Sequence, residues 1–180
     1  MKWGRAASVF GSLVLFIAVT AFLLQAFPGV VGADHALIVM SGSMEPTIGT
    51  GSVVFVAERP PETVSEGDVI TFSDDSGRLI THRVNAVHRT ETSFRFVTKG
   101  DANENVDPEP VYRNSYVGSV PEVHLPLLGS YYLSIPFIGY IITFAETGLG
   151  WLILVVTPLL LLIANELWVL YSSLEVEKAD

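Results

Sequence analysis

The sequence has no cysteine and only three lysines in 180 residues. The absence of cysteine excludes a disulfide framework and a cysteine metal cluster. The net charge is −9 at pH 7. Because nucleic-acid binding depends on contacts from lysine and arginine to phosphates, this acidic composition argues against a nucleic-acid partner. We expect no cofactor.

Charge is also missing from long stretches of the chain. Ala6–Ala33 contains no charged residue, and Ala6–Ala26 is long enough to cross a hydrocarbon core of about 30 Å as a helix. Lys2 and Arg5 precede this run, so the positive-inside rule predicts a cytoplasmic N-terminus and an exterior position from residue 34 onward. A cleaved signal peptide is the alternative, but its apolar stretch would be only about 7–15 residues long. We favour an uncleaved anchor.

A second uncharged run, Thr147–Asn165, predicts another membrane helix, which extends to residue 171 and returns the C-terminus to the cytoplasm. Pro158 should bend this helix without excluding it. Leu125–Ala145 is uncharged too, but prolines and glycines interrupt it, so we expect it to lie on the membrane surface or to re-enter the bilayer. The expected divisions are 1–27 (cytoplasmic N-terminus and first anchor), 34–122 (exterior domain), 123–146 (surface or re-entrant segment), 147–171 (second membrane helix) and 172–180 (short acidic tail).

The exterior residues carry strand patterns at close spacing, with no long helical periodicity between them. Clusters of glycine, proline, asparagine and aspartate separate the strands and supply turn chemistry. The pattern predicts a mainly β domain, a small coiled sheet or barrel-like structure flanked by the two membrane helices. The expected strands are Leu37–Met40, Ser52–Ala57, Asp68–Ser73, Leu79–His88, Ser93–Thr98 and Val111–Val120. Asp74–Gly77 predicts a hairpin turn between the third and the fourth of them.

The polar stretch Ser41–Thr47 directly follows the apolar strand pattern Ala36–Met40. Two serines flank Gly42, and Pro46 prevents the strand from continuing. A reactive hydroxyl must be exposed at a turn close to backbone N–H groups, and this stretch offers such a position. Composition alone favours a simpler alternative, a Ser/Gly/Pro turn between two strands.

A histidine, His82, lies within the fourth expected strand. Alternation along that strand predicts one apolar face that carries His82 together with Ile80, Val84, Ala86 and His88. Taken alone, His82 is more simply a core histidine bonded to a backbone carbonyl. His88 should lie about 20 Å along the strand from His82, too far to share one site with it.

Two aspartates, Asp101 and Asp107, follow the strand that ends at Lys99, and Gly100 allows a sharp turn before them. A solvated acidic turn and a weak Ca²⁺ loop are the alternatives here. The EF-hand pattern fails because no bidentate glutamate stands at its twelfth position, so we expect no bound metal. A serine at a turn, a histidine on a strand and aspartates in a loop are the parts of a nucleophile, a base and an orienting acid.

The chain resembles type I signal peptidases of the branch shared by archaea, the endoplasmic-reticulum catalytic subunit and some sporulating bacteria. The resemblance covers nearly the whole chain, and its specificity lies in the order of the blocks rather than in any one of them. The blocks are Ser41-Gly42-Ser43-Met44-Glu45-Pro46-Thr47, Gly67-Asp68-Val69-Ile70-Thr71-Phe72, Thr81-His82-Arg83-Val84, Thr98-Lys99-Gly100-Asp101-Ala102-Asn103 with Asp107, and Ile135-Pro136-Phe137-Ile138-Gly139-Tyr140.

This resemblance implies a membrane-bound serine endopeptidase, a hydrolase that removes signal peptides from secreted preproteins. It implies Ser43 as the nucleophile and His82 as the base, where the bacterial branch has a lysine. It also implies Asp107 as the third member of the set, Asp101 as a supporting residue, and Ser41 as an oxyanion-hole donor beside the backbone N–H of Ser43. The active site would lie outside the cell membrane near the bilayer, and further subunits are compatible with the resemblance.

Three alternatives remain open at this point. One is a Ser/Lys dyad that uses Lys99, the one lysine of residues 34–122. Another is a membrane-tethered β-domain without catalysis that binds exported proteins. The third is an ion-binding exterior module that uses Asp101 and Asp107 and would show metal-dependent folding. Substitution of Ser43, His82 or Lys99 discriminates between the first two.

Overall fold

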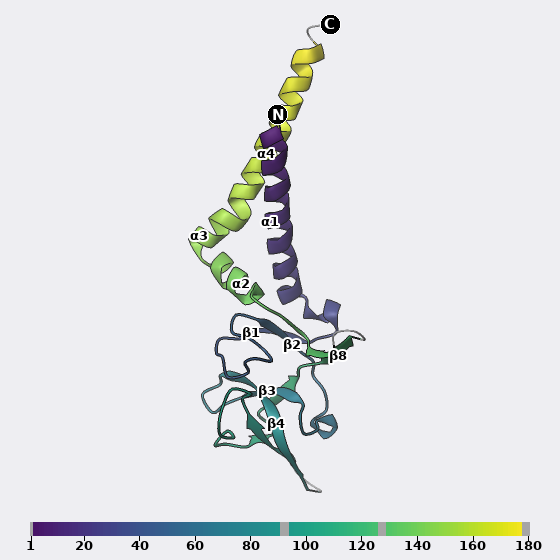
Figure 1. Ribbon diagram of the computed structural model, residues 1–180, viewed down its shortest axis with the longest axis vertical. Helices are drawn as coiled ribbons and strands as arrows, with labels where there is room; N and C mark the ends of the chain where they lie inside the picture. Colours follow the sequence, from purple (N-terminus) through teal and green to yellow (C-terminus); the bar gives the residue numbers. More distant parts are fainter. Residues whose placement is uncertain (1, 91–93, 126–128, 178–180) are drawn as a thin grey trace. The chain divides into compact units, whose positions relative to one another are not determined.

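The computed structural model describes residues 2–90, 94–125 and 129–177 (Figure 1). It divides the chain into two compact units, one made of Met1–Leu23 with Tyr140–Asp180 and the other of Leu24–Gly139. The two units are described separately. The start of the fifth expected strand at Ser93 and part of the expected surface segment lie outside the described residues.

The first unit is helical. Its elements are most of α1 (Lys2–Ala26) and α2 (Ile138–Glu146), with α3 (Gly148–Trp151), the π-helical turn η3 (Leu152–Val156) and α4 (Thr157–Glu177). Thr147 caps α3, because its hydroxyl accepts the Gly150 N–H at 2.9 Å. Pro158 stands just after the π-helical turn, and this is where a residue without an N–H interrupts the regular helical ladder.

Among the described residues, two helical stretches are long and apolar enough to cross a membrane. They are Val9–Ala26, with a mean hydropathy of 2.3, and Gly148–Val169, with a mean hydropathy of 2.2. Only 11% and 6% of the residues in these windows are buried within the protein, so their apolar side chains are not covered by the chain itself. Length and exposure together suit an apolar solvent.

The second unit is mainly β, as predicted, and its described residues hold three antiparallel sheets. The first has the order β1 (His35–Ile38), β2 (Val53–Val56), β10 (Ser134–Ile135). The second has the order β6 (Val111–Tyr112), β5 (Phe94–Lys99), β4 (Leu79–Arg89), β3 (Val69–Ser73), β7 (Tyr116–Ser119). The third is the pair β8 (Glu122–Leu125) and β9 (Gly129–Tyr132), and two 3₁₀ turns complete the unit, η1 (Pro28–Val31) and η2 (Pro61–Thr63).

The barrel-like closure that we expected is absent among the described strands. The first and second sheets are connected by a single bridge between Ala57 and Ser119, and the ladder does not continue beyond it. The expected strand Val111–Val120 is also two strands, because a turn closed by the Ser115 N–H to the Tyr112 carbonyl separates β6 from β7. The sheets therefore stay open, with free edges in the described part of the chain.

A β-bulge changes the face pattern of β4. The register passes from Val84 opposite Thr98 to Ala86 opposite Val97, so Asn85 has no partner of its own. Beyond the bulge, Val87 rather than Ala86 packs with Phe96 in the core. The expectation that Ala86 and His88 share the face of His82 is therefore wrong, because the extra residue reverses the alternation.

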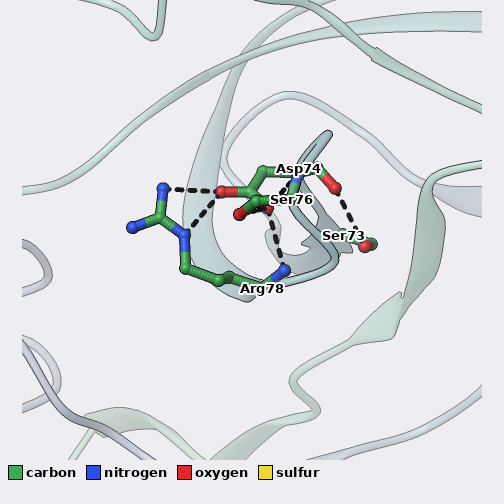
Figure 2. A network of polar contacts seen from close by, with 4 residues as sticks. All are labelled: Ser73, Asp74, Ser76 and Arg78. Atoms are coloured by element: carbon green, nitrogen blue, oxygen red, sulfur yellow. Dashed lines mark hydrogen bonds and ion pairs between the residues drawn. The ribbon is translucent and has the colours of Figure 1, made fainter.

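The turn between β3 and β4 is the hairpin that Asp74–Gly77 predicts. Asp74 Oδ1 accepts hydrogen bonds from the backbone N–H groups of Ser76 and Arg78, and Gly77 has a φ of 80°. The Arg78 guanidinium donates to Asp74 Oδ2 from Nε at 2.8 Å (Figure 2). Hydrogen bonds from Ser76 and Arg78 lower the pKa of Asp74 to about 2. The turn is thus fixed by its own side chains.

Two hydrophobic clusters form the core of the β unit. The first packs Met44 and Ile48, which lie in and just after the serine turn (Ser41–Thr47), against β2 and β3, and the second lies under β3, β4 and β5. The clusters are Met44, Ile48, Val54, Val56, Val69 and Val120 in the first, and Val64, Ile70, Phe72, Val84, Phe96 and Val111 in the second.

Candidate active site

The serine turn is held from below by its own apolar residues. Met44 and Ile48 are 2% and 1% exposed and belong to the first core cluster. The Ile48 N–H donates to the Met44 carbonyl at 2.9 Å, which makes a compact turn of the stretch that follows Ser43. Because Met44 and Ile48 face the core, the two serines lie on the opposite side of the turn, where Ser43 is partly exposed and Ser41 is exposed.

His82 stands in the middle of the second sheet, opposite Ile70 of β3. It is only 7% exposed, and the ring of Phe72 lies against it at 6.3 Å between centroids. Its Nε2 lies 3.0 Å from Ser43 Oγ, and its Nδ1 lies 2.7 Å from Asp107 Oδ2. An ionised Asp107 can only accept, so Nδ1 carries the proton and Nε2 is left to accept from the serine.

The side chains of Thr98 and His82 hold the Asp107 carboxylate in place. Thr98 Oγ1 donates to Asp107 Oδ2 at 2.6 Å, the same oxygen that receives His82 Nδ1. Burial raises the pKa of Asp107, but the hydrogen bonds from His82 and Thr98 outweigh burial and hold the pKa below its usual value. Asp107 is therefore a carboxylate at neutral pH, as an acceptor for a histidine N–H must be.

Asp101 has a different partner. Arg83 donates to its two oxygens from Nε at 2.8 Å and from Nη2 at 2.7 Å, a fork-to-fork pair. Burial raises the pKa of Asp101, but the hydrogen bonds from Arg83 and Thr47 outweigh it, so its pKa is also lowered. Arg83 Nη1 donates in addition to the Gly67 carbonyl at 2.7 Å and to Tyr132 Oη at 2.6 Å. Asp101 thus connects the loop to β4, the strand that carries His82.

The loop that carries Asp101 and Asp107 also contacts the serine turn directly. The Ala102 N–H donates to the Ser43 carbonyl at 2.8 Å. Gly100 lies so close to the same oxygen that a Cβ at this position would be 2.6 Å from it. Only glycine allows this approach.

A groove of about 740 Å³ opens in front of the serine turn. It is lined by β1 with the residues that follow it, by the start of β4, and by the buried apolar side chains of Met44, Ile48 and Val54. Its lining includes Leu37, Val39, Ser41, Ser43, Ile80 and His82. The nucleophile and base candidates therefore lie at an open apolar groove, not in the core.

Several known proteins are similar to this chain in sequence. No family model matches the chain. The signal peptidase complex catalytic subunit SEC11 of Candida dubliniensis is 30% identical over 131 residues, which are 70% of this chain and 75% of that protein. SEC11 of Lodderomyces elongisporus is 31% identical over the same shares. Signal peptidase I W of Bacillus subtilis is 42% identical over 74 residues, 41% of this chain and 39% of that protein.

The chain belongs to the type I signal peptidases. Within them it is of the endoplasmic-reticulum type, the one to which SEC11 belongs, and it is a hydrolase of the signal peptidase class. The resemblance inferred from the sequence blocks is confirmed.

In this signal peptidase, neither Lys99, the base of the alternative Ser/Lys dyad, nor His88 is among the described residues that contact the Ser43 hydroxyl. Lys99 lines a separate cavity of about 210 Å³ with Arg83 and Asp101. His88 lies further along β4, where it is exposed and stands opposite Arg95 of β5. The hydroxyl of Ser43 instead contacts His82 and, at 3.3 Å, the hydroxyl of Ser41.

Sequence reasoning left out several residues that contact the members of the candidate site. Arg83 and Thr98 stand inside the matched blocks, next to His82 and Lys99, but nothing in the local pattern shows which side chains they meet. Tyr132 is 49 residues away from Arg83, so its contact depends on the fold alone.

Proposed function

We propose that this chain is a membrane-anchored serine endopeptidase that removes N-terminal signal peptides from preproteins through an acyl-enzyme. The observation that supports it most is the continuous set of contacts from Ser43 Oγ through His82 to Asp107, at 3.0 and 2.7 Å. Membership of the signal peptidase family supplies the reaction class.

In the proposed mechanism, Ser43 Oγ attacks the scissile carbonyl while His82 Nε2 takes its proton. The tetrahedral intermediate then collapses as His82 returns that proton to the leaving amine, which leaves the signal peptide as an ester on Ser43. Water, deprotonated by His82, hydrolyses the ester. Asp107 holds the Nδ1–H tautomer and stabilises the imidazolium that forms.

Ser41 and the Ser43 N–H are the proposed oxyanion donors. The Ser41 hydroxyl lies 3.3 Å from Ser43 Oγ and is exposed to the groove, so it can turn toward a negative oxygen that develops beside the nucleophile. Asp101 takes the supporting role, because its pair with Arg83 fixes the loop that carries Asp107.

The substrate is proposed to bind as an extended strand in the groove. In the described part of the first sheet, β1 is an edge strand. The start of β4 is also unpaired toward β5, because their ladder begins only at Arg83 opposite Lys99. Two such edges can pair with an extended peptide, whose alternate side chains enter the groove toward its apolar lining. Small residues before the cleavage site, the rule for signal peptides, would fit there.

The two apolar helices are proposed to anchor the enzyme as a multi-pass protein of the cell membrane, with a cytoplasmic N-terminus and an exterior active site. Contact of the β unit with lipid is proposed near Phe137, in the expected surface segment. Phe137 is 69% exposed and has a φ of 63°, an uncommon conformation that a bulky residue adopts only under constraint.

The test is processing of a signal-bearing preprotein by the purified chain in lipid vesicles, with the product identified by N-terminal sequencing. We expect one cut after the signal peptide, which is lost when the small residues before the cut are replaced by large ones. Binding of the intact preprotein without a cut would favour the non-catalytic alternative. The yeast relatives are named as subunits of a complex, so cutting by the isolated chain would also show that no other subunit is needed.

A further inference from the structure

Thr98 is a buried polar residue to which the proposed mechanism gives no role. It is 0% exposed and lies in β5, opposite Val84 of β4. Since residues two apart on a strand share a face, Val84 and Thr98 lie on the face of the sheet that carries His82. Thr98 therefore stands beside the base without touching the proposed reacting atoms.

Thr98 holds Asp107 at two points. Its carbonyl accepts the Asp107 N–H at 2.8 Å, which fixes the backbone of the loop against β5. Its hydroxyl donates to Asp107 Oδ2 at 2.6 Å, which fixes the rotation of the carboxyl group. A backbone contact alone would leave the carboxylate free to rotate away from His82.

The direction of the hydroxyl proton is set by its partner. Asp107 is a carboxylate and can only accept, so the Thr98 hydroxyl must donate to it. Oδ2 then receives two donors, Thr98 Oγ1–H and His82 Nδ1–H. These two hydrogen bonds hold the Asp107 carboxylate in one orientation toward the imidazole.

We propose that Thr98 is a positioning residue of the peptidase, which acts on His82 through Asp107 by holding the Asp107 carboxylate in line with the imidazole. This inference rests on the proposed function for its kinetic consequences, but the contact itself can be tested without activity. Loss of the hydroxyl should lower kcat and leave KM nearly unchanged, because Thr98 does not line the groove.

Thr98→Val keeps the shape and removes the hydroxyl, whereas Thr98→Ser keeps the hydroxyl. We expect Thr98→Val to lower kcat about 10- to 100-fold with KM within about twofold, and Thr98→Ser to stay within about threefold of wild type. The matched control is Thr71→Val, another threonine at 0% exposure, whose hydroxyl bonds Thr81 at 2.9 Å on the opposite face of the sheet. Should Thr98→Val not fold, the pair Thr98→Ala and Thr98→Ser makes the same comparison, since these variants differ by one oxygen.

The second readout is the ¹H resonance of the His82 Nδ1 proton in ¹⁵N-histidine-labelled full-length protein in micelles. The chain has four histidines, so loss of one resonance in His82→Gln assigns it. We expect Thr98→Val to shift this resonance, and Thr98→Ser and Thr71→Val to leave it in place. If Thr98→Val shifts the His82 resonance but the wild-type protein cuts no preprotein, the proposed function is refuted while the Thr98–Asp107 contact stands.

Three results overturn the inference: a Thr98→Val kcat within about threefold of wild type, a Thr98→Ser kcat as low as that of Thr98→Val, or an unchanged His82 resonance in Thr98→Val. An equal loss of kcat in Thr71→Val at equal loss of thermal stability would also overturn it, because the effect would then follow from stability alone.

Discussion

A single methyl group at position 100 should disturb the nucleophile without touching any reacting side chain. A Cβ on Gly100 would stand 2.6 Å from the Ser43 carbonyl oxygen and 2.8 Å from Asn103 Nδ2. Real Cβ atoms essentially never approach another atom more closely than 3.0 Å. The backbones at Gly100 and Ser43 must therefore separate by at least about 0.4 Å, the difference between 3.0 Å and the 2.6 Å to the Ser43 carbonyl oxygen. The displaced atom belongs to the proposed nucleophile.

The expected effect follows from the geometry of the serine and histidine. Ser43 Oγ and His82 Nε2 lie 3.0 Å apart, and a shift of the Ser43 backbone misaligns this contact. Because misplacement by about 1 Å can cost about 10²-fold in rate, we expect Gly100→Ala to lower kcat/KM about 10- to 100-fold. This range is about 1.4–2.7 kcal/mol of transition-state stabilisation. The assay is the initial rate of preprotein processing by reconstituted enzyme.

Two other glycines supply controls. A Cβ on Gly118 would lie 2.5 Å from the Ala57 carbonyl oxygen, an equally tight contact remote from the serine turn, and a Cβ on Gly49 would meet only Ser52 Oγ at 3.9 Å. Gly118→Ala should lower thermal stability but preserve the rate of the folded fraction, and Gly49→Ala should change neither. Full activity of Gly100→Ala at unchanged stability, or an equal loss of rate in Gly118→Ala, would refute the reasoning.

Three further predictions concern the oxyanion donor, acid stability and lipid contact. Ser41→Ala should lower kcat about 10²–10³-fold, and Ser41→Thr, which keeps a hydroxyl, should restore part of it; equal rates for wild type and Ser41→Ala would exclude Ser41 as a donor. The pKa values of Asp101 and Asp107 are lowered in the folded protein, so the stability that they contribute is present above about pH 4 and is lost as the pH falls below it. Thermal unfolding followed by circular dichroism from pH 6 to pH 3 should show a steep fall in Tm below about pH 4 that is shallower in Asp101→Asn, and parallel curves would contradict this. Phe137→Ser should slow processing of a membrane-bound preprotein while cleavage of a soluble peptide stays unchanged, and equal effects on both would remove the proposed lipid contact.

The hairpin that joins β3 to β4 could be predicted because local chemistry sets it. Asp74–Gly77 supplies a turn with its own side-chain hydrogen bonds, and the apolar runs on either side become β3 and β4. The break between β6 and β7 and the bulge at Asn85 could not be predicted. The bulge depends on how β4 pairs with β5, and the local turn at Tyr112–Ser115 directs β6 and β7 to different partners, β5 and β3; alternation within one strand records neither.

The candidate site divides in the same way. Ser43, His82 and Asp107 were singled out from block order and resemblance, and the structure brings their side chains into contact. The partner of Asp101 was not predicted, because Arg83 reaches it from β4, and Arg83 in turn donates to Tyr132 of β9; only the fold places these elements together. The hydroxyl of Thr98 was missed for the same reason.

The most direct measurement of the central claim compares initial processing rates of one preprotein by reconstituted wild type, Ser43→Ala, His82→Ala and Lys99→Ala. Thermal unfolding of each variant controls for folding. A Ser43 nucleophile with a His82 base predicts that Ser43→Ala cuts nothing above background, that His82→Ala loses at least about 10³-fold, and that Lys99→Ala keeps the wild-type rate. Cleavage by Ser43→Ala or His82→Ala at the wild-type rate would contradict the assignment, and loss of cleavage in Lys99→Ala alone would favour a Ser/Lys dyad.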